Sequence, residues 1–318
     1  LFTFGKPITS NLRTSSGTAL SSFCFGTMQW GGKADVADSR TMFDAACGSG
    51  INFFDTAHGY TGGASETLLG EFAAENRDEL FIATKCASTG DCRPEAIQQD
   101  FETSLARLKM DQVDMLYMHR WSDEVPLEAT FEVLAKWVET GQVRHIGVSN
   151  YAAWQVMKAE RVAASLGLKI EMLQPMYSLV KRQAEVEILP MCSSEHIAVV
   201  PYSPLGGGLL TGKYAGGAEG RLTHDPMYKS RYGQNWMHSA AEALGDLATE
   251  IGLSPITLAV AWVAHNPVIT APILSASRSE QLQPSLDAIG LQLDPEIYAR
   301  LTALTTTPAP ATDRSEES

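Results

Sequence analysis

Short apolar runs alternate with longer amphipathic runs along most of this chain. Between the apolar runs, hydrophobic residues recur at helical spacing, as at Ile97, Phe101, Leu105 and Leu108 and again over residues 127–138. The alternation predicts strand–helix units and a parallel sheet. Eight runs have the length of strands, and they cover residues 23–26, 51–56, 80–84, 113–119, 143–148, 171–174, 197–201 and 268–272.

The spacing of these units predicts the fold class. Most units take about 25 to 35 residues, close to one eighth of the roughly 250 residues of a typical closed β/α barrel. We therefore expect an α/β fold: a single (β/α)8 TIM-barrel domain over residues 1–304 that includes an N-terminal β-hairpin within residues 1–20. A long loop over residues 205–237 would follow the seventh strand and precede helices at 239–251 and 255–265. Residues 305–318 have little to bury and are predicted to form a disordered tail.

A doubly wound nucleotide-binding sheet is the competing architecture. It requires a G-x-G-x-x-G turn after the first strand, and this chain has none there. Its glycine stretch, residues 206–208, follows the seventh run instead. In β/α barrels the loops after strands seven and eight are the usual phosphate-binding loops, so the position of the glycines also favours the barrel.

Composition narrows the class of function. The 318 residues are 44% hydrophobic and 19% charged, which is typical of a globular chain. A net charge of -13 without basic clusters argues against nucleic-acid binding and favours a small-molecule ligand. No signal peptide and no apolar run of roughly 18 residues is visible, so we expect no membrane span, and a monomer or a small homo-oligomer in the cytoplasm. The cysteines are odd in number and lack a C-x-x-C pair, which is typical of reduced thiols: Cys24, Cys47, Cys86, Cys92 and Cys192.

Polar residues stand where three of the apolar runs end. Asp55 lies near the end of the second run, Lys85 follows the third, His119 ends the fourth, and Tyr60 comes five residues after Asp55. Each alone is typical of a capping or surface residue. In a barrel, however, the carboxyl ends of all strands meet at one mouth, where catalytic groups lie.

Together these four side chains suit the reduction of a carbonyl group. Tyr60, with an ordinary pKa of about 10, would protonate the oxygen. A cationic Lys85 would lower that pKa toward neutrality, and Asp55 would keep Lys85 charged and in place. His119 would donate a hydrogen bond to the carbonyl oxygen.

An ordered set of motifs resembles the aldo-keto reductases, in the branch of the bacterial aryl-alcohol dehydrogenases and potassium-channel β subunits. The resemblance covers about residues 25–289 and implies that Asp55, Tyr60, Lys85 and His119 form the catalytic tetrad of that family. The motifs are Gly26-Thr27-Met28, Phe54-Asp55-Thr56-Ala57, Ser65-Glu66-Thr67-Leu68-Leu69-Gly70, Ala83-Thr84-Lys85, Asp114-Met115-Leu116-Tyr117-Met118-His119, Gly147-Val148-Ser149-Asn150, Gln174 and Tyr202-Ser203-Pro204-Leu205.

The resemblance also implies a nicotinamide cofactor. Side-chain amides and a hydroxyl suit its carboxamide, a tyrosine ring would face the nicotinamide, and glycine lets backbone amides approach the pyrophosphate. Arg278 favours NADP(H) over NAD(H), because guanidinium binds phosphate with paired donors. Pro284-Ser285 replaces the family's Glu-Asn pair, which leaves NAD(H) possible. The predicted cofactor site is Thr27, Met28, Asp55, Ser149, Asn150, Gln174, Tyr202, Ser203, Leu205, Gly207, Lys213, Ser277, Arg278 and Gln281.

The substrate side is expected to be aromatic, with Trp30, Tyr60, His119 and Trp121 lining the mouth. Two other functions remain open. One is an NADPH-binding regulatory subunit of the channel β type, although some of those subunits carry Asn at the position of His119. The other is a barrel aldolase in which Lys85 forms a Schiff base. The dispersed histidines give no H-x-H or H-E-x-x-H pattern, so no metal site is predicted.

Overall fold

Eight short parallel strands form the centre of the computed structural model, which describes residues 12–312, 314 and 316. Their order is β7-β6-β5-β4-β3-β2-β1-β8. The amides of Thr270 and Ile273 donate to the carbonyls of Val199 (2.8 Å) and Pro201 (2.9 Å), so the β8 edge also meets the β7 edge. The sheet therefore closes, and the predicted barrel is confirmed. The strands are β1 (Cys24–Gly26), β2 (Phe53–Asp55), β3 (Phe81–Cys86), β4 (Val113–Met118), β5 (Val143–Ser149), β6 (Ile170–Gln174), β7 (Ala198–Val199) and β8 (Ile273–Leu274).

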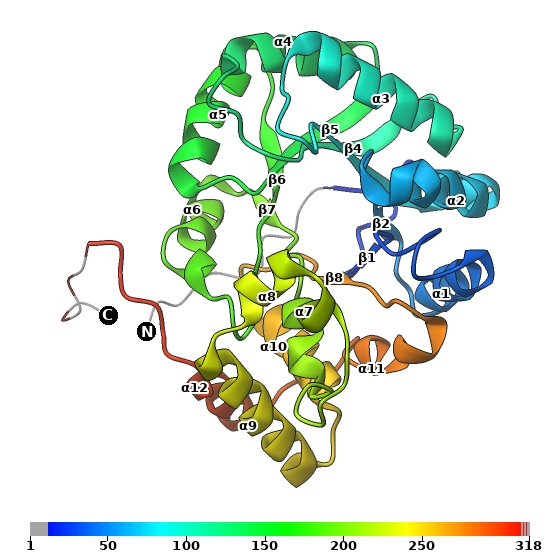
Figure 1. The fold of residues 1–318 in the computed structure, drawn as a ribbon. Helices are drawn as coiled ribbons and strands as arrows, with labels where there is room; N and C mark the ends of the chain where they lie inside the picture. Colours follow the sequence, from blue (N-terminus) through cyan, green and yellow to red (C-terminus); the bar gives the residue numbers. More distant parts are fainter. Residues whose placement is uncertain (1–11, 313, 315, 317–318) are drawn as a thin grey trace.

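Helices surround the strands (Figure 1). Those that form the outer layer are α1 (Val36–Gly48), α2 (Ala64–Ala73), α3 (Pro94–Leu108), α4 (Leu127–Glu139), α5 (Ala153–Ser165), α6 (Ile188–Glu195), α9 (Asn235–Ile251), α10 (Pro255–His265), α11 (Gln283–Leu286) and α12 (Pro295–Ala303). The apolar stripe of α3 faces inward as expected, with Ile97, Phe101 and Leu108 fully buried. Pro94 opens that helix in its first turn, where a missing N–H costs nothing.

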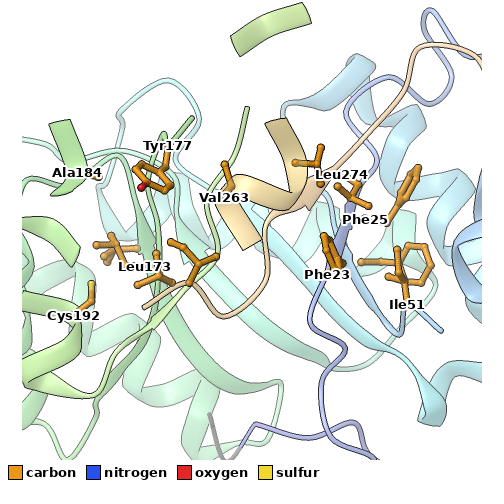
Figure 2. Packing of buried hydrophobic residues seen from close by; sticks show 14 of the residues in the cluster. Phe23, Phe25, Ile51, Leu173, Tyr177, Ala184, Cys192, Val263 and Leu274 are labelled. Carbon is orange, nitrogen blue, oxygen red and sulfur yellow. The ribbon is translucent and has the colours of Figure 1, made fainter. Parts of the chain in front are cut away.

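The core has two layers, because successive side chains of a strand point to opposite faces. On β4, Met115 and Tyr117 point into the barrel, whereas Leu116 and Met118 pack against the helices. Figure 2 shows part of the outer layer, where Phe25 and Leu274 lie on paired strands. The inner layer is smaller; its members include Cys24, Phe53, Phe81, Ala83, Met172, Ala198, Val200, Ala271 and Ile273.

Two predicted boundaries were wrong. The eighth strand is Ile273–Leu274, not residues 268–272. Pro272 has no N–H, and the chain pairs with β1 only from the Pro272 carbonyl onward, which accepts from the amide of Cys24 (3.1 Å).

The predicted loop over residues 205–237 is largely helical. It contains the 3₁₀ helix η4 (Gly206–Thr211), α7 (Arg221–His224), α8 (Pro226–Tyr232) and the start of α9. Asp225 caps α8, its carboxylate accepting from the amide of Met227 (2.9 Å), and Pro226 follows at the first position. The Asp225-Pro226 pair is therefore the sequence signal for the start of α8.

The chain before β1 is described only in part. The predicted hairpin falls mostly on residues 1–11, which lie outside the described residues. In the described part, Arg13 and Ala19 form an antiparallel bridge.

After β8, the segment that contains Arg278 leads through the 3₁₀ helix η5 (Ser279–Gln281) into α11, and a separate α12 ends the described helices. No single helix in the described ranges is long and apolar enough to cross a membrane. Only α9 and α10 taken together, with a bend of 100° between them, pass that test of length and composition.

Arg182 connects α12 to the rest of the barrel through hydrogen bonds. Its guanidinium donates to both carboxylate oxygens of Glu185 (2.9 Å each) and to the carbonyls of Thr302 (3.0 Å) and Thr305 (3.1 Å), and it lies over the ring of Trp262. The Arg182 side chain is 6% exposed. Removing it would leave the Glu185 carboxylate with the Tyr177 hydroxyl as a donor (2.8 Å) but without its cation, and would take the guanidinium donor from two carbonyls.

We expect Arg182→Met to lower the free energy of unfolding by about 3 kcal/mol, because it leaves a partly buried charge unpaired. Arg300→Met is the matched control. Arg300 also makes two hydrogen bonds to one carboxylate, that of Glu250, but both side chains are exposed. Its loss should cost at most about 1 kcal/mol. Urea titrations of both variants test this, and equal losses would contradict the role assigned to Arg182.

Candidate functional site

Three of the four predicted catalytic side chains are in direct contact. Lys85 lies on β3, Asp55 ends β2, and Tyr60 opens the 3₁₀ helix η1 (Tyr60–Gly63). Nζ of Lys85 donates to Oδ2 of Asp55 (2.5 Å), to the carbonyl of Thr56 (2.7 Å) and to Oη of Tyr60 (3.4 Å). His119 follows β4, and its ring meets that of Tyr60 edge to face at 6.0 Å between centroids. The structure thus brings the four groups together.

Lys85 is fully buried, and its charge depends on Asp55. Burial alone lowers the pKa of a lysine, but the Asp55 carboxylate and the Tyr60 phenol outweigh that effect and raise the pKa of Lys85. A permanent ammonium group therefore lies at the carboxyl end of the barrel. Its ring contacts, 4.9 Å to the centroid of Tyr60 and 5.9 Å to that of Tyr117, add to its stabilisation.

The pKa of Tyr60 differs from the expectation. Burial raises it above its ordinary value, and the nearby charge of Lys85 opposes this rise without reversing it. The expected lowering toward neutrality was therefore wrong, because the sequence shows the charged neighbour but not the depth of burial. The phenol is protonated at neutral pH and can act as a proton donor.

His119 is neutral at ordinary pH. Burial, and then the charges of Lys85 and Arg120, lower its pKa to about 3. Its Nδ1 is buried and has no hydrogen-bond partner among the described residues. A buried N–H without an acceptor would be costly, so the favoured tautomer carries its proton on Nε2. The imidazole is thus prepared to donate one hydrogen bond from Nε2.

Several residues predicted to bind the cofactor lie beside the four predicted catalytic side chains. Gln174 ends β6, and its Nε2 donates to Oδ1 of Asp55 (2.8 Å). The Asn150 amide donates to the carbonyl of His119 (3.0 Å), and its Oδ1 accepts from Oη of Tyr202 (2.6 Å). Ser149, which ends β5, donates to the carbonyl of Gln174 (3.0 Å). These polar side chains therefore join the proposed catalytic group to the loops after β5, β6 and β7.

The glycine stretch after β7 has the geometry of a close-approach loop. Gly206, Gly207 and Gly208 all have positive φ, and a Cβ on Gly207 would lie 2.7 Å from the ring of Tyr228. A Cβ on Gly208 would lie 3.9 Å from Nζ of Lys213, so this amine is directed to the same loop. Ser203 and Leu205 precede the stretch, and Ser203 also has positive φ. The amides of Gly206 and Gly208 donate to the carbonyls of Ser203 (2.9 Å) and Leu205 (3.0 Å), so the structure shows a tight glycine turn with the Lys213 amine beside it.

The segment after β8 is hydrogen-bonded to α1, a helix far from it in the sequence. Ser277 donates to the side chain of Gln281 (3.0 Å), and Arg278 is exposed and 3.7 Å from Glu280. The neighbouring Ser279 donates its amide (3.0 Å) and its hydroxyl (2.5 Å) to Asp38 in the first turn of α1. Sequence reasoning missed Asp38, because no local pattern links α1 to a segment more than two hundred residues away.

The two tryptophans predicted to bind the substrate, Trp30 and Trp121, lie in different surroundings. Trp30 is fully buried between the rings of Phe25, Phe43 and Phe72, so its assignment to the mouth was wrong. A large aromatic residue after a strand is equally suited to the core. Trp121 remains partly exposed after His119.

Trp121 lies beside other aromatic rings. Its ring contacts those of Tyr151 at 5.3 Å and Trp154 at 5.6 Å between centroids. Trp154 itself is strongly exposed.

Two predicted cofactor residues lie at the end of β1. The hydroxyl of Thr27 is buried and bonded to the Asp55 carbonyl (3.1 Å) and to Ser65 (2.7 Å), so it organises the loop rather than facing a ligand. Met28 is partly exposed beside it. Within the described ranges, no three His, Cys, Asp or Glu side chains are grouped so that they could hold a metal ion.

Tyr117 is a further residue that sequence reasoning did not single out. It is fully buried inside the barrel, near Asp55, and its hydroxyl lies 2.6 Å from Sδ of Met172. Gly147 leaves room for its ring, since a Cβ there would lie 2.7 Å from it. The motif Asp114-Met115-Leu116-Tyr117-Met118-His119 contained the signal: alternation along β4 places Tyr117 on the inner face.

Comparison with known proteins agrees with this arrangement. The aldo/keto reductase family model matches residues 22–306. YrpG of Bacillus subtilis, described as an uncharacterized oxidoreductase, is 34% identical over 90% of this chain and 92% of its own length. The norsolorinic acid reductase of Aspergillus flavus is 31% identical over 90% of this chain and 78% of its own. A probable voltage-gated potassium channel subunit beta of Oryza sativa is 31% identical over 91% and 94%.

The low pKa of His119 has a measurable effect on stability. That pKa is about 3 in the folded protein and about 6.5 in an unfolded chain, so the unfolded state binds more protons between these values. The stability is fully present above about pH 6.5 and is lost as the pH falls toward 3. In urea titrations at about pH 7.5 and pH 4.5, we expect the wild-type protein to lose more free energy of unfolding than His119→Asn. Equal losses would contradict the assigned pKa.

Proposed function

The chain belongs to the aldo/keto reductase family, and we propose that it is an NAD(P)H-dependent oxidoreductase that reduces an aldehyde or ketone to an alcohol, or runs the reverse reaction. One observation carries the proposal: a buried ammonium group, Lys85, contacts both a carboxylate and a phenol, and a neutral imidazole faces the same phenol. Carbonyl reduction needs a proton donor, a charge that stabilises the donor after transfer, and a hydrogen bond to the oxygen.

Tyr60 is the general acid in this proposal. Its raised pKa keeps the phenol protonated at neutral pH, and an alkoxide is basic enough to take that proton. The charge of Lys85, 3.4 Å from the phenol oxygen, stabilises the phenolate that remains. Asp55 keeps Lys85 charged and holds it in position. In the reverse direction the phenolate would accept the alcohol proton.

His119 orients the carbonyl. The proton on Nε2 gives it one donor, and a pKa of about 3 keeps the ring neutral, so it does not compete with Tyr60 as an acid. The His119 carbonyl is held by Asn150, which fixes the backbone from which the ring projects. A single donor at a fixed point selects one orientation of the substrate oxygen.

The residues present suit a nicotinamide cofactor, which supplies or accepts the hydride. Asn150, Gln174 and Ser149 offer amide and hydroxyl groups for the carboxamide, and Tyr202 offers a ring beside them. The glycine stretch and Lys213 would hold the diphosphate. The remaining proposed contacts are Met28, Asp55, Ser203, Leu205, Ser277, Arg278 and Gln281, and Arg278 favours NADP(H).

The substrate proposed is an aromatic or otherwise apolar carbonyl compound. Trp121, partly exposed two residues after His119, offers a ring near the mouth. Some relatives are named norsolorinic acid reductases, which is consistent with an aromatic substrate. We place the enzyme in the cytoplasm, where the free thiols of its cysteines would stay reduced.

The two other functions have less support. A Schiff base requires an unprotonated, accessible amine, whereas Lys85 is fully buried, hydrogen-bonded to three oxygens and has a raised pKa. A channel subunit is suggested by the motif resemblance and by the names of some relatives. The contacts among all four predicted catalytic groups favour an enzyme.

We expect the purified protein to oxidise NADPH in the presence of aromatic aldehydes or ketones. Tyr60→Phe should lower kcat by about 10²- to 10⁴-fold while leaving the Kd of NADPH within about twofold, because it removes only the transferred proton. Absorbance at the nicotinamide band measures turnover, and protein fluorescence measures binding. Turnover at the wild-type rate in the variant would exclude Tyr60 as the acid.

Arg278→Ala tests the cofactor preference. Because guanidinium pairs with a 2′-phosphate, the variant should bind NADPH at least about tenfold more weakly and NADH nearly as before. Glu280→Ala, which removes the neighbouring carboxylate, is the matched control and should not weaken NADPH. Equal weakening of both cofactors by Arg278→Ala would show that Arg278 does not recognise the 2′-phosphate.

A further inference from the structure

Arg107, in the last turn of α3, reaches the loop that carries Tyr60. Its Nη1 donates to the carbonyl of His58 (2.9 Å) and to Oε2 of Glu66 (3.2 Å). Glu66 is fully buried in the first turn of α2, and its side chain forms an ion pair with Arg107. Arg107 therefore bonds to the backbone two residues before Tyr60 and to the helix that follows it.

The same guanidinium lies against the far end of that loop. A Cβ on Gly63 would lie 2.4 Å from Nε of Arg107 and 2.9 Å from Nη2. Gly63 has a φ of +99°, which a side chain would also strain. One side chain thus contacts the loop both before and after Tyr60.

The loop is irregular and depends on contacts from outside. Thr61 and Gly62, the two residues after Tyr60, have positive φ, so η1 is a distorted 3₁₀ helix. The Thr61 hydroxyl donates to the carbonyl of Trp30 (2.8 Å), and Arg107 supports the loop from the opposite element, α3. The contact that matters, Lys85 Nζ to Tyr60 Oη, is 3.4 Å, near the upper limit of a hydrogen bond. A small displacement of the loop would break it.

The support also reaches the strand that carries Lys85. The second oxygen of Glu66 accepts from Oγ1 of Thr84 (2.7 Å), the residue before Lys85. Helices α2 and α3 can approach so closely because of Gly70, where a Cβ would lie 2.2 Å from the Leu108 carbonyl oxygen. Arg107 and Glu66 therefore connect the Tyr60 loop to β3.

We propose that Arg107 is a positioning residue for Tyr60, which sets the distance between the phenol and Lys85 without touching substrate or cofactor. This inference rests on the proposed function, in which Tyr60 is the acid. It predicts that a change at Arg107 lowers kcat and leaves cofactor binding unchanged.

The test is Arg107→Lys, which keeps a positive charge beside Glu66 but lacks the planar group that can serve two acceptors and pack on Gly63. We expect kcat to fall about 10- to 100-fold, with the Kd of NADPH within about twofold of the wild-type value. Arg144→Lys is the matched control. The Arg144 side chain is also 26% exposed and also pairs with a fully buried carboxylate, Asp114, but it lies at the amino end of β5, away from the site. It should leave kcat within about twofold.

Two further variants separate positioning from general stability. In the Tyr60→Phe background, Arg107→Lys should lower the remaining single-turnover rate by less than about twofold, because its effect passes through the phenol. Gly63→Ala, which displaces the guanidinium without removing it, should also lower kcat and provides the test if Arg107→Lys does not fold.

The outcomes are distinct. Wild-type kcat in both Arg107→Lys and Gly63→Ala, or an undiminished effect of Arg107→Lys in the Tyr60→Phe background, would overturn the positioning role while the reductase stands. A wild-type protein with no turnover of any carbonyl compound would overturn the proposed function and this role with it.

Discussion

The ion pair between Lys85 and Asp55 determines the chemistry available at the mouth of the barrel. Both groups are withdrawn from water; Asp55 keeps the pKa of Lys85 raised, and Lys85 offsets part of the effect by which burial raises the pKa of Asp55. The ammonium then acts on its neighbours. It opposes the effect of burial on the phenol of Tyr60, and it helps to keep the imidazole of His119 neutral. One buried charge thus shifts the pKa of two further groups, although burial is the larger cause for each of them.

The pair lies directly above an apolar interior. The inner layer of the core includes Phe53, Phe81 and Met115, none of which can solvate a charge. Lys85 therefore finds all its partners at the strand ends: a carboxylate, a backbone carbonyl and a phenol. Asp55 is satisfied from the opposite side by Gln174 on β6. Because these partners come from separate strands and loops, closure of the barrel is a requirement for the site.

Much of the fold and site could be predicted from sequence. The alternation of strands and helices gave the barrel, and the polar residues at strand ends gave four groups that the structure places in contact. These signals are local, because periodicity and strand ends are properties of short segments. The predictions that failed depend on distant partners. Trp30 lies in the core because three phenylalanines from other elements surround it, and burial of Tyr60 could not be inferred from its neighbours in the chain.

The predicted bounds of the eighth strand and of the loop after β7 were wrong for a related reason, because they also depend on residues far away in the sequence. The apolar run before Ile273 has the composition of a strand. In the structure, its residues hydrogen-bond to β7, and pairing with β1 begins only at the carbonyl of Pro272, which has no N–H of its own. The helices over residues 205–237 are short and follow glycines, so propensity alone did not reveal them. Asp38 and Arg107 act across large separations in the sequence, to Ser279 and to His58, and only the folded structure shows them.

The position of β8 constrains how the protein is made. This strand joins β1 to β7, and it comes after residue 270 of 318. During synthesis, the edges of β1 and β7 therefore stay unpaired until β8, the last of the eight strands, has been made. Open parallel edges are prone to association with other chains, and pairing over such sequence separations is slow. Until β8 is in place, the edges of β1 and β7 are the parts of the sheet most exposed to aggregation.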